Sequence, residues 1–189
     1  ASALPPVALP CQLPRLRAGC AQLGPINPPP QPLRELTSPG GPDFAKGNEI
    51  WDFSLVEPDN RRPFDYAQRQ EMLDSLGKAT PDDLLGNWRD GRIKLFLIQR
   101  LLLFRREHQE LFAEGSYEPL EVTGEFAASA VAFARTYGEN SIVVFAPRLS
   151  ARVGFPPIGE AWRDTAMTLP NDFRGARERK GSQGRRRAF

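Results

Sequence analysis

Residues 92–108, RIKLFLIQRLLLFRREH, contain the most regular hydrophobic pattern in the chain. Their apolar side chains recur at the spacing of helical turns, which predicts one long helix. We expect its buried face to consist of Leu95, Ile98 and Leu102, flanked by Ile93, Leu97, Leu101 and Phe104. A face this broad is typical of a helix packed against a protein core. Lys94, Gln99 and Arg100 interrupt the apolar run at 93–104, so no membrane-spanning segment is predicted.

Two shorter helices are expected before this long one. The first covers 63–76, with Pro63 in its first turn and Gly77 just past its end, because proline suits a helix start and glycine a helix end. Asp65 would lie at its positive N-terminal end. The buried residues of this helix are expected to be Met72, Leu73 and Leu76.

The second short helix has a clear start signal. Thr80 is expected as its N-cap, Pro81 as its first residue and Asp83 as the partner that completes a capping box. Asp90 and Gly91 are expected to break the chain before the long helix begins.

After Gly115 the hydrophobic spacing changes from helical turns to alternation. Strands are predicted at 117–122, 130–136, 141–146 and 166–169, with a turn at 137–140 that contains Gly138. The continuous apolar run at 142–145 is typical of a central strand. These strands predict an antiparallel sandwich with one face against the helical part.

The composition is that of a soluble globular protein and argues against several kinds of site. Hydrophobic residues make up 40% of the 189 residues, charged residues 25%, and the net charge is +2. Cys11 and Cys20 are too few for a disulfide framework, and no His or Cys pair completes a metal site. We therefore expect free thiols, a cytoplasmic location, no cofactor and no metal. The N-terminus lacks the basic start of a secretory signal.

The two ends of the chain have unusual compositions. Residues 1–36 are rich in proline and leucine, and Pro28, Pro29, Pro30 and Pro32 are expected to exclude a regular helix there. The missing initiating Met and this proline content favour the hypothesis of a fragment whose ends are partly translated out of frame. The C-terminal tail is basic and is expected to be disordered and solvated.

Residues 51–66, WDFSLVEPDNRRPFDY, form the segment with the richest chemistry. Aromatic rings, carboxylates and the guanidinium groups of Arg61 and Arg62 alternate there, and Pro58 and Pro63 restrict the backbone. A stiff loop with flat rings and forked donors suits the apolar faces and hydroxyls of a sugar chain. The alternative is an ordinary charged surface loop whose ion pairs contribute little to stability.

Three stretches stand in an ordered, nearly gapless series: TSPGGPD at 37–43, GNEIWDFSLVEPDNRRPFDY at 47–66 and NWRDGRIKLFLIQRLLLFRREHQELFAEGSYEPLEV at 87–122. Together they resemble the maltooligosyltrehalose synthase family, which is part of the α-amylase family of (β/α)8 barrels. The resemblance extends over most of residues 33–170.

This resemblance implies an α+β fold made of the last strand and helices of a (β/α)8 barrel, followed by an antiparallel β-sandwich-like C-terminal domain. A whole barrel needs about 250 residues, so this chain cannot close one alone. The expected division is an irregular segment at 1–36, the end of the barrel with its substrate loop at 37–114, a C-terminal β-domain at 115–170 and a disordered basic tail at 171–189.

The resemblance also implies an isomerase of trehalose biosynthesis, a 1,4-alpha-D-glucan 1-alpha-D-glucosylmutase. It would convert the reducing-end α-1,4 link of a maltooligosaccharide to an α,α-1,1 link by intramolecular transglucosylation. Maltooligosyltrehalose trehalohydrolase is the implied functional partner. The implied substrate contacts are Trp51, Asp52, Asp59, Asn60, Arg61, Arg62 and Tyr66.

No catalytic residue is expected in this chain. The resemblance implies catalytic carboxylates at the ends of barrel strands four, five and seven, all before residue 37, yet residues 1–36 contain no Asp and only Glu35. Asp43, Glu49 and Asp52 lie close in sequence, but Glu49 is expected to be a salt-bridged structural group. His108 is expected to cap or pack at a helix end. The chain is therefore predicted to be inactive alone.

Two other functions remain open at this level. The loop and the β-domain could form a non-catalytic carbohydrate-binding module. The basic tail could instead bind nucleic acid, although a solvated end is the favoured interpretation. The basic side chains concerned are Arg174, Arg177, Arg179, Lys180, Arg185, Arg186 and Arg187. No membrane partner is expected.

Overall fold

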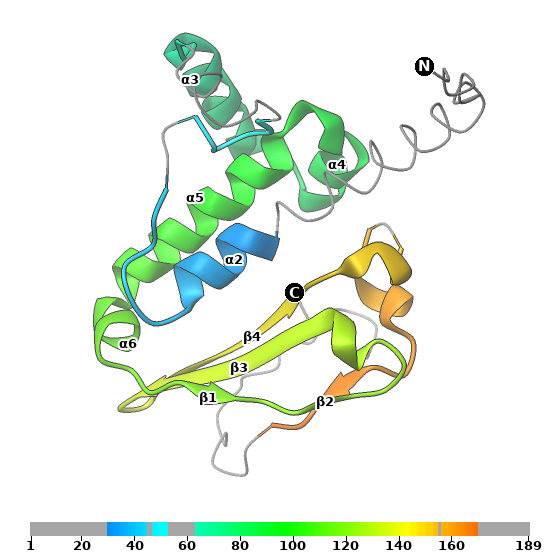
Figure 1. Cartoon of the computed structure of the whole chain (residues 1–189). Helices are drawn as coiled ribbons and strands as arrows, with labels where there is room; N and C mark the ends of the chain where they lie inside the picture. The colour runs from blue at the N-terminus through cyan, green and yellow to red at the C-terminus, as the bar shows by residue number, and fades with distance from the viewer. Residues whose placement is uncertain (1–29, 45–46, 53–62, 155, 170–189) are drawn as a thin grey trace, which may run out of the picture.

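A computed structural model describes residues 30–44, 47–52, 63–154 and 156–169. These residues form two regions, which we call the helical part (30–114) and the sheet part (115–169). Figure 1 shows the helices on one side of the molecule, the sheet on the other, and helix α2 between helix α5 and the sheet. The described fold is thus α+β.

The described residues of the helical part contain five α-helices. They are α2 (Pro30–Thr37), α3 (Tyr66–Ser75), α4 (Pro81–Gly86), α5 (Arg92–Glu107) and α6 (Gln109–Ala113), counted over the described residues. Short 3-10 helices, η3 (Leu76–Lys78) and η4 (Trp88–Asp90), follow α3 and α4.

The predicted start of α4 is confirmed, and that of α3 is confirmed for Asp65 but not for Pro63. Thr80 is the N-cap of α4, Pro81 is its first residue, and the side chains of Thr80 and Asp83 form a reciprocal capping box. Asp65 is the N-cap of α3 and accepts a hydrogen bond from the backbone N–H of Gln68. Pro63 therefore precedes this helix and does not lie in its first turn. The predicted stop at Gly77 is confirmed for the α-helix, since α3 ends at Ser75 with Leu76 as its C-cap, and Gly77 lies in the 3-10 turn that follows.

The exclusion of a helix by the N-terminal prolines was wrong for residues 30–36. Helix α2 begins at Pro30 and includes Pro32. Both prolines lie in the first turn, where backbone N–H groups have no intrahelical acceptor, so nothing is lost when proline removes them. The prediction treated these prolines as interior residues. Residues 1–29, with Pro28 and Pro29, lie outside the described part.

The long helix is confirmed as α5, with His108 as its C-cap. Leu95 and Ile98 are buried as expected, but Leu102 is 47% exposed, so the prediction was wrong for this residue. Leu95 lies in a core cluster with residues of the short helices, whereas Leu102 belongs to none of the core clusters of the described residues. Leu76, Leu84 and Leu95 form the core here, with Met72 and Leu73 packed against it.

The sheet part contains two small antiparallel sheets. The first has the order β1 (Glu118–Pro119), β3 (Ala130–Tyr137), β4 (Asn140–Pro147), and the second pairs β2 (Val122–Thr123) with β5 (Ala166–Met167). Three further 3-10 helices are η5 (Ala127–Ser129), η6 (Ser150–Arg152) and η7 (Gly159–Trp162). Tyr137 pairs with Asn140, so Gly138 and Glu139 form the turn, as predicted.

Three details of the strand prediction were wrong. The strand expected at 117–122 is divided between two sheets, β1 and β2. The strand expected at 166–169 is shorter, since β5 ends at Met167. The central strand is β3 and not β4, because β4 has β3 as its only strand neighbour in the described sheet. A continuous apolar run indicates burial of both faces, and α2 supplies part of that cover by packing Leu33 on Val144 and Ala146.

The two parts are joined by buried contacts. Arg135 of β3 is 1% exposed and donates hydrogen bonds to the carbonyl oxygens of Phe112 at 3.1 Å, Gly115 at 2.9 Å and Ser116 at 3.3 Å. Burial lowers the pKa of the Arg135 guanidinium, and the positive charge of Arg105 lowers it further. Because the guanidinium spans α6 and the loop to β1, it fixes the helical part on the sheet.

The described residues contain no closed barrel, and the assignment of 37–114 to the end of a (β/α)8 barrel stays a prediction. Small antiparallel sheets are present, in agreement with the coarser prediction of an α+β chain. Among the described helices, none is both long and apolar enough to cross a bilayer.

Candidate functional site

The candidate site is built around residues 47–52, which pass over the N-terminal end of α5. Gly91, with a φ of +84°, forms the turn between η4 and α5. A Cβ atom on Gly91 would lie 3.0 Å from Cβ of Ile50 and 3.2 Å from the backbone nitrogen of Trp51. Glycine is therefore needed both for its backbone conformation and for the close approach of this segment.

Glu49 anchors the first half of the segment. Its Oε1 accepts a hydrogen bond from the backbone N–H of Gly47 at 3.2 Å, and its Oε2 pairs with Nε of Arg69 at 3.4 Å. The guanidinium of Arg69 lies 5.5 Å from the ring centroid of Phe64, which packs against Gly47. The prediction that Glu49 is a salt-bridged structural carboxylate is confirmed.

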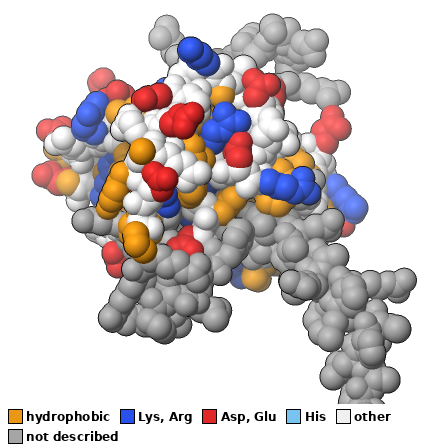
Figure 2. Space-filling view, turned by 90° about the horizontal axis from the view of Figure 1, so that it is seen from above, with side chains coloured by type: hydrophobic (Ala, Val, Ile, Leu, Met, Phe, Trp, Pro, Cys, Tyr) orange, Lys and Arg blue, Asp and Glu red, His pale blue; other side chains and the backbone are white. Residues whose placement is uncertain are grey.

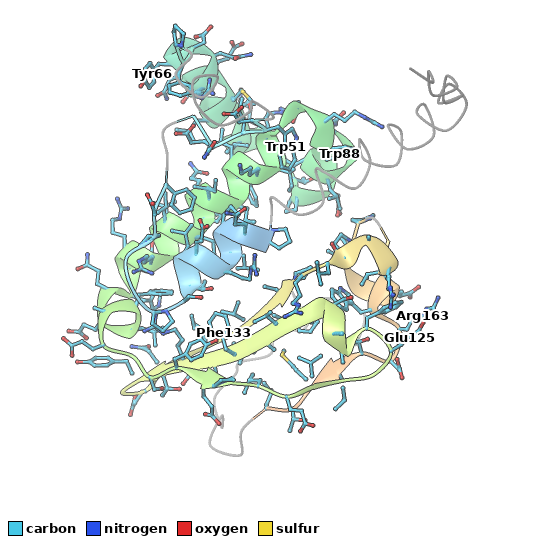
Figure 3. All side chains as sticks on the ribbon, viewed as in Figure 1. Trp51, Tyr66, Trp88, Glu125, Phe133 and Arg163 are labelled. Atoms are coloured by element: carbon cyan, nitrogen blue, oxygen red, sulfur yellow. The ribbon has the colours of Figure 1, made fainter. Side chains whose placement is uncertain are left out.

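Trp51 and Trp88 form an aromatic pair at the second half of the segment. Nε1 of Trp51 donates a hydrogen bond to the carbonyl oxygen of Trp88 at 2.6 Å. The two rings meet edge to face, with centroids 6.4 Å apart and an angle of 73° between the planes. Both residues are half-buried. Figure 3 shows them side by side next to α4 and α5.

Lys94 lies beneath this aromatic pair. Its Nζ donates a hydrogen bond to the carbonyl oxygen of Ile50 at 3.1 Å and lies 6.0 Å from the ring centroid of Trp51. Burial lowers the pKa of the Lys94 ammonium, and the negative charges of Asp52, Glu49 and Glu35 oppose that shift.

Polar groups surround the outer side of the pair. The guanidinium of Arg89 lies 5.0 Å from the Trp88 ring centroid. Arg92 Nε pairs with Asp90 Oδ2 at 2.7 Å. Asp52 is exposed at the end of the described segment. Figure 2, seen from the side of α3, shows acidic and basic side chains interspersed among hydrophobic ones on this face of the molecule.

The predicted substrate contacts do not all lie together in the structure. Trp51 and Asp52 are adjacent at the anchored segment. Tyr66 is the first residue of α3 and is 66% exposed, and Figure 3 shows it well apart from Trp51. Asp59, Asn60, Arg61 and Arg62 lie outside the described residues.

Sequence reasoning missed Trp88 and Lys94. Lys94 is four residues before Ile98, so it lies on the same apolar face, and a cation at that position was a readable signal of a special environment. Trp88 stands directly before the predicted break at Asp90 and Gly91. Only the fold shows that this break brings Trp88 against Trp51, which is 37 residues away in the sequence.

His108, the one histidine of the chain, has a structural role. His108 stacks on Phe104 at a centroid distance of 4.3 Å, and its Nδ1 lies 3.0 Å from the Phe104 carbonyl oxygen. The expected capping and packing role is confirmed. Within the described ranges, no group of three or more His, Cys, Asp or Glu residues could hold a metal ion.

Comparison with known proteins gives relatives that are much longer than this chain. No protein-family model matches. Two curated proteins from strains of Mycobacterium tuberculosis are 35% identical over 139 residues, which is 74% of this chain and 15% of each relative. Both carry the name maltooligosyl trehalose synthase as a provisional assignment. The chain thus spans about 15% of the length of the curated relatives it matches.

Solved structures agree with these relatives. Maltooligosyltrehalose synthase from Arthrobacter ramosus is 33% identical, with a TM-score of 0.61, and the match covers 83% of this chain and 19% of that one. A mutant of the same enzyme is 32% identical, with a TM-score of 0.62 and coverage of 87% and 20%. The resemblance read from the sequence is therefore confirmed, and the chain corresponds to one part of a maltooligosyl trehalose synthase.

Proposed function

We propose that this chain forms part of the substrate-binding rim of a maltooligosyl trehalose synthase. In the whole enzyme, the rim would hold the reducing end of a maltooligosaccharide while the terminal α-1,4 link is converted to an α,α-1,1 link. This is the reaction of an isomerase, a 1,4-alpha-D-glucan 1-alpha-D-glucosylmutase, in trehalose biosynthesis. A trehalohydrolase that releases trehalose from the product is the proposed functional partner, and both are proposed to be cytoplasmic.

The observation that carries this proposal is the anchored Trp51–Trp88 pair. The indole N–H of Trp51 is already used by the Trp88 carbonyl oxygen, so the ring orientation is fixed before any ligand arrives. A preorganised aromatic surface loses little conformational entropy on binding. Sugar rings present apolar C–H faces to such surfaces and hydroxyls to the neighbouring charged groups, here Asp52 and Arg89.

We further propose that the loop residues Asp59, Asn60, Arg61 and Arg62 contact the same substrate, together with Tyr66. Residues 59–62 come seven to ten positions after Asp52 in the sequence, so they belong to the stretch that continues from the anchored segment. Forked guanidinium donors suit vicinal hydroxyls and would hold a cleaved glucose while it turns over.

Bond breaking is proposed to depend on carboxyl groups outside this chain. Glycoside chemistry of this family needs one nucleophile and one general acid, held opposite each other. Of the acids near the anchored segment, Glu49 is occupied by Arg69 and by the Gly47 N–H. The chain alone is therefore expected to bind maltooligosaccharides without rearranging them.

Titration of the full 189-residue chain with maltopentaose tests both statements. We expect saturable binding that Trp51→Ala weakens by about tenfold, the loss of about 1.4 kcal/mol of ring contact. Tyr117→Ala is the matched control, because Tyr117 is an exposed aromatic residue of the sheet part. Reducing ends should stay constant over long incubation.

The two outcomes are separable. A flat titration, with the fold verified by circular dichroism, would remove the rim proposal. Disappearance of reducing ends with formation of a trehalose end would instead show that this chain contains the catalytic acids.

A further inference from the structure

Lys94 is the residue whose position is hardest to explain by folding alone. It is 9% exposed and lies in the first turn of α5, where the helix dipole disfavours a positive charge. Its neighbours on the same helix face are apolar, so a leucine or methionine would fit the core better. A buried cation retained at such a place calls for a specific contact.

The contacts of Lys94 all lead to the candidate site. Nζ donates to the carbonyl oxygen of Ile50, and the ammonium faces the ring of Trp51. The side chain of Ile50 packs against the Leu76–Leu84–Leu95 core, and its part-buried carbonyl oxygen has the Lys94 ammonium as a donor. The negative charges of Asp52 and Glu49 of the same segment and of Glu35 of α2 favour the charged ammonium and raise its pKa against the effect of burial.

We propose that Lys94 is a positioning residue for sugar binding: it holds residues 50–52 so that the Trp51 ring and the Asp52 carboxylate keep their places on the rim. This inference rests on the proposed function above. Lys94 is proposed to act through Trp51 without touching the sugar, because its side chain is buried and its ammonium contacts the Ile50 carbonyl oxygen and the Trp51 ring.

A purely structural role predicts different behaviour from a positioning role. If Lys94 only stabilised the fold, Lys94→Met would lower Tm and leave the affinity of the folded molecules unchanged. If it positions Trp51, the same change removes a poorly solvated charge but also takes the donor from the Ile50 carbonyl oxygen, so the two effects oppose each other and Tm changes little. The ring then loses its support and sugar affinity falls.

The experiment uses the full chain labelled with 5-fluorotryptophan. The three tryptophan ¹⁹F resonances are assigned with Trp51→Phe, Trp88→Phe and Trp162→Phe. In Lys94→Met we expect the Trp51 resonance to move and the Trp162 resonance to stay, with maltopentaose affinity reduced about fivefold. Lys94→Arg keeps a charged donor, so the Trp51 resonance and the maltopentaose affinity should both lie closer to those of the wild type. Arg100→Met, an exposed cation of the same helix, is the matched control and should change neither.

An unmoved Trp51 resonance in Lys94→Met, with unchanged affinity, would overturn the positioning role. Should Lys94→Met fail to fold, Lys94→Gln, which keeps a donor without the charge, is measured in the same way and decides by the same criteria. Failure of the wild-type chain to bind maltopentaose would remove the proposed function. The ¹⁹F shift would then still decide whether Lys94 sets the Trp51 ring.

Discussion

Two buried cations, one in each part of the molecule, contact backbone carbonyl groups in different ways. Arg135 of the sheet part donates to the carbonyl oxygens of Phe112, Gly115 and Ser116, which belong to the junction between α6 and β1. Lys94 of the helical part donates to that of Ile50 and faces Trp51. Burial lowers the pKa of both.

This comparison indicates a division of roles. The planar guanidinium satisfies several carbonyl groups at once, so Arg135 is a structural joint between the two parts. The ammonium of Lys94 contacts one short segment, residues 50–52, so its effect is expected to be local and to concern the proposed rim. The following predictions test this difference, beginning with the largest effect.

Arg135→Met is expected to lower the free energy of unfolding by about 3 kcal/mol, because several buried carbonyl groups lose their donor together. Urea denaturation measures this change. Lys94→Met, measured in parallel, should stay within about 1 kcal/mol of wild type, since one carbonyl group is lost and one buried charge is relieved. Equal losses in the two variants would contradict the division of roles.

Gly91→Ala is expected to cost about 2 kcal/mol and to weaken maltopentaose binding. The positive φ strains any residue with a Cβ, and that Cβ would lie 3.0 Å from Cβ of Ile50. Gly138→Ala is the control, because Gly138 also has a positive φ but has no neighbouring atom within 4 Å of the added Cβ. A difference in sugar affinity between these variants, measured by titration, would locate the effect at the segment. Equal sugar affinities in the two variants would show that the position of residues 47–52 does not affect sugar binding.

Thr80→Ala is expected to lower Tm by about 2–4 °C, as the loss of one helix N-cap does in a chain of this size. The Thr80 hydroxyl lowers the pKa of Asp83 by hydrogen bonding, so this part of the stability is lost as pH falls through the lowered pKa of Asp83. Thermal melts at neutral and acidic pH measure both effects. A Tm difference that is the same at both pH values would argue against the capping box.

The smallest expected effect is the pH dependence of Lys94. Its folded-state pKa is lowered below the ordinary 10.5, so the unfolded chain binds more protons at alkaline pH and stability rises there. The cost of the buried charge is full below the folded-state pKa and disappears as pH approaches 10.5. The unfolding free energy of Lys94→Met minus that of wild type should therefore fall with rising pH, while Glu35, Glu49 and Asp52 stay ionised. A constant difference in urea titrations would count against the buried charge.

The sequence predicted structural features correctly where they depend only on neighbouring residues. The capping box of Thr80 and Asp83, the break at Gly91 and the turn at Gly138 each depend on fewer than five consecutive positions. The prediction made from Pro30 and Pro32 was wrong for the opposite reason. Whether a proline permits a helix depends on its place in the first turn, which is known only once the helix start is known.

The burial of helix and strand faces was predicted less well than the helices and strands themselves. Leu102 continues the apolar pattern of α5 but is exposed, and β4 is an edge strand in spite of its continuous apolar run. Periodicity tells which side chains share a face, but neighbours from elsewhere in the chain decide how much of that face they cover. The site depended on the same kind of contact, because Trp51 meets Trp88 and Lys94 across 37 and 43 positions.

The sequence by itself determined where helix α4 begins, where α5 and the β3–β4 hairpin begin and end to within a residue, and the family whose part this chain resembles. Only the tertiary structure decided that Trp51, Trp88 and Lys94 form one site, that Arg135 joins the two parts, and that Leu102 stays exposed. The physical reason is the separation in sequence over which each interaction acts. Caps, turns and periodicity act within a few residues, whereas burial and pairing of polar groups depend on segments that folding brings together.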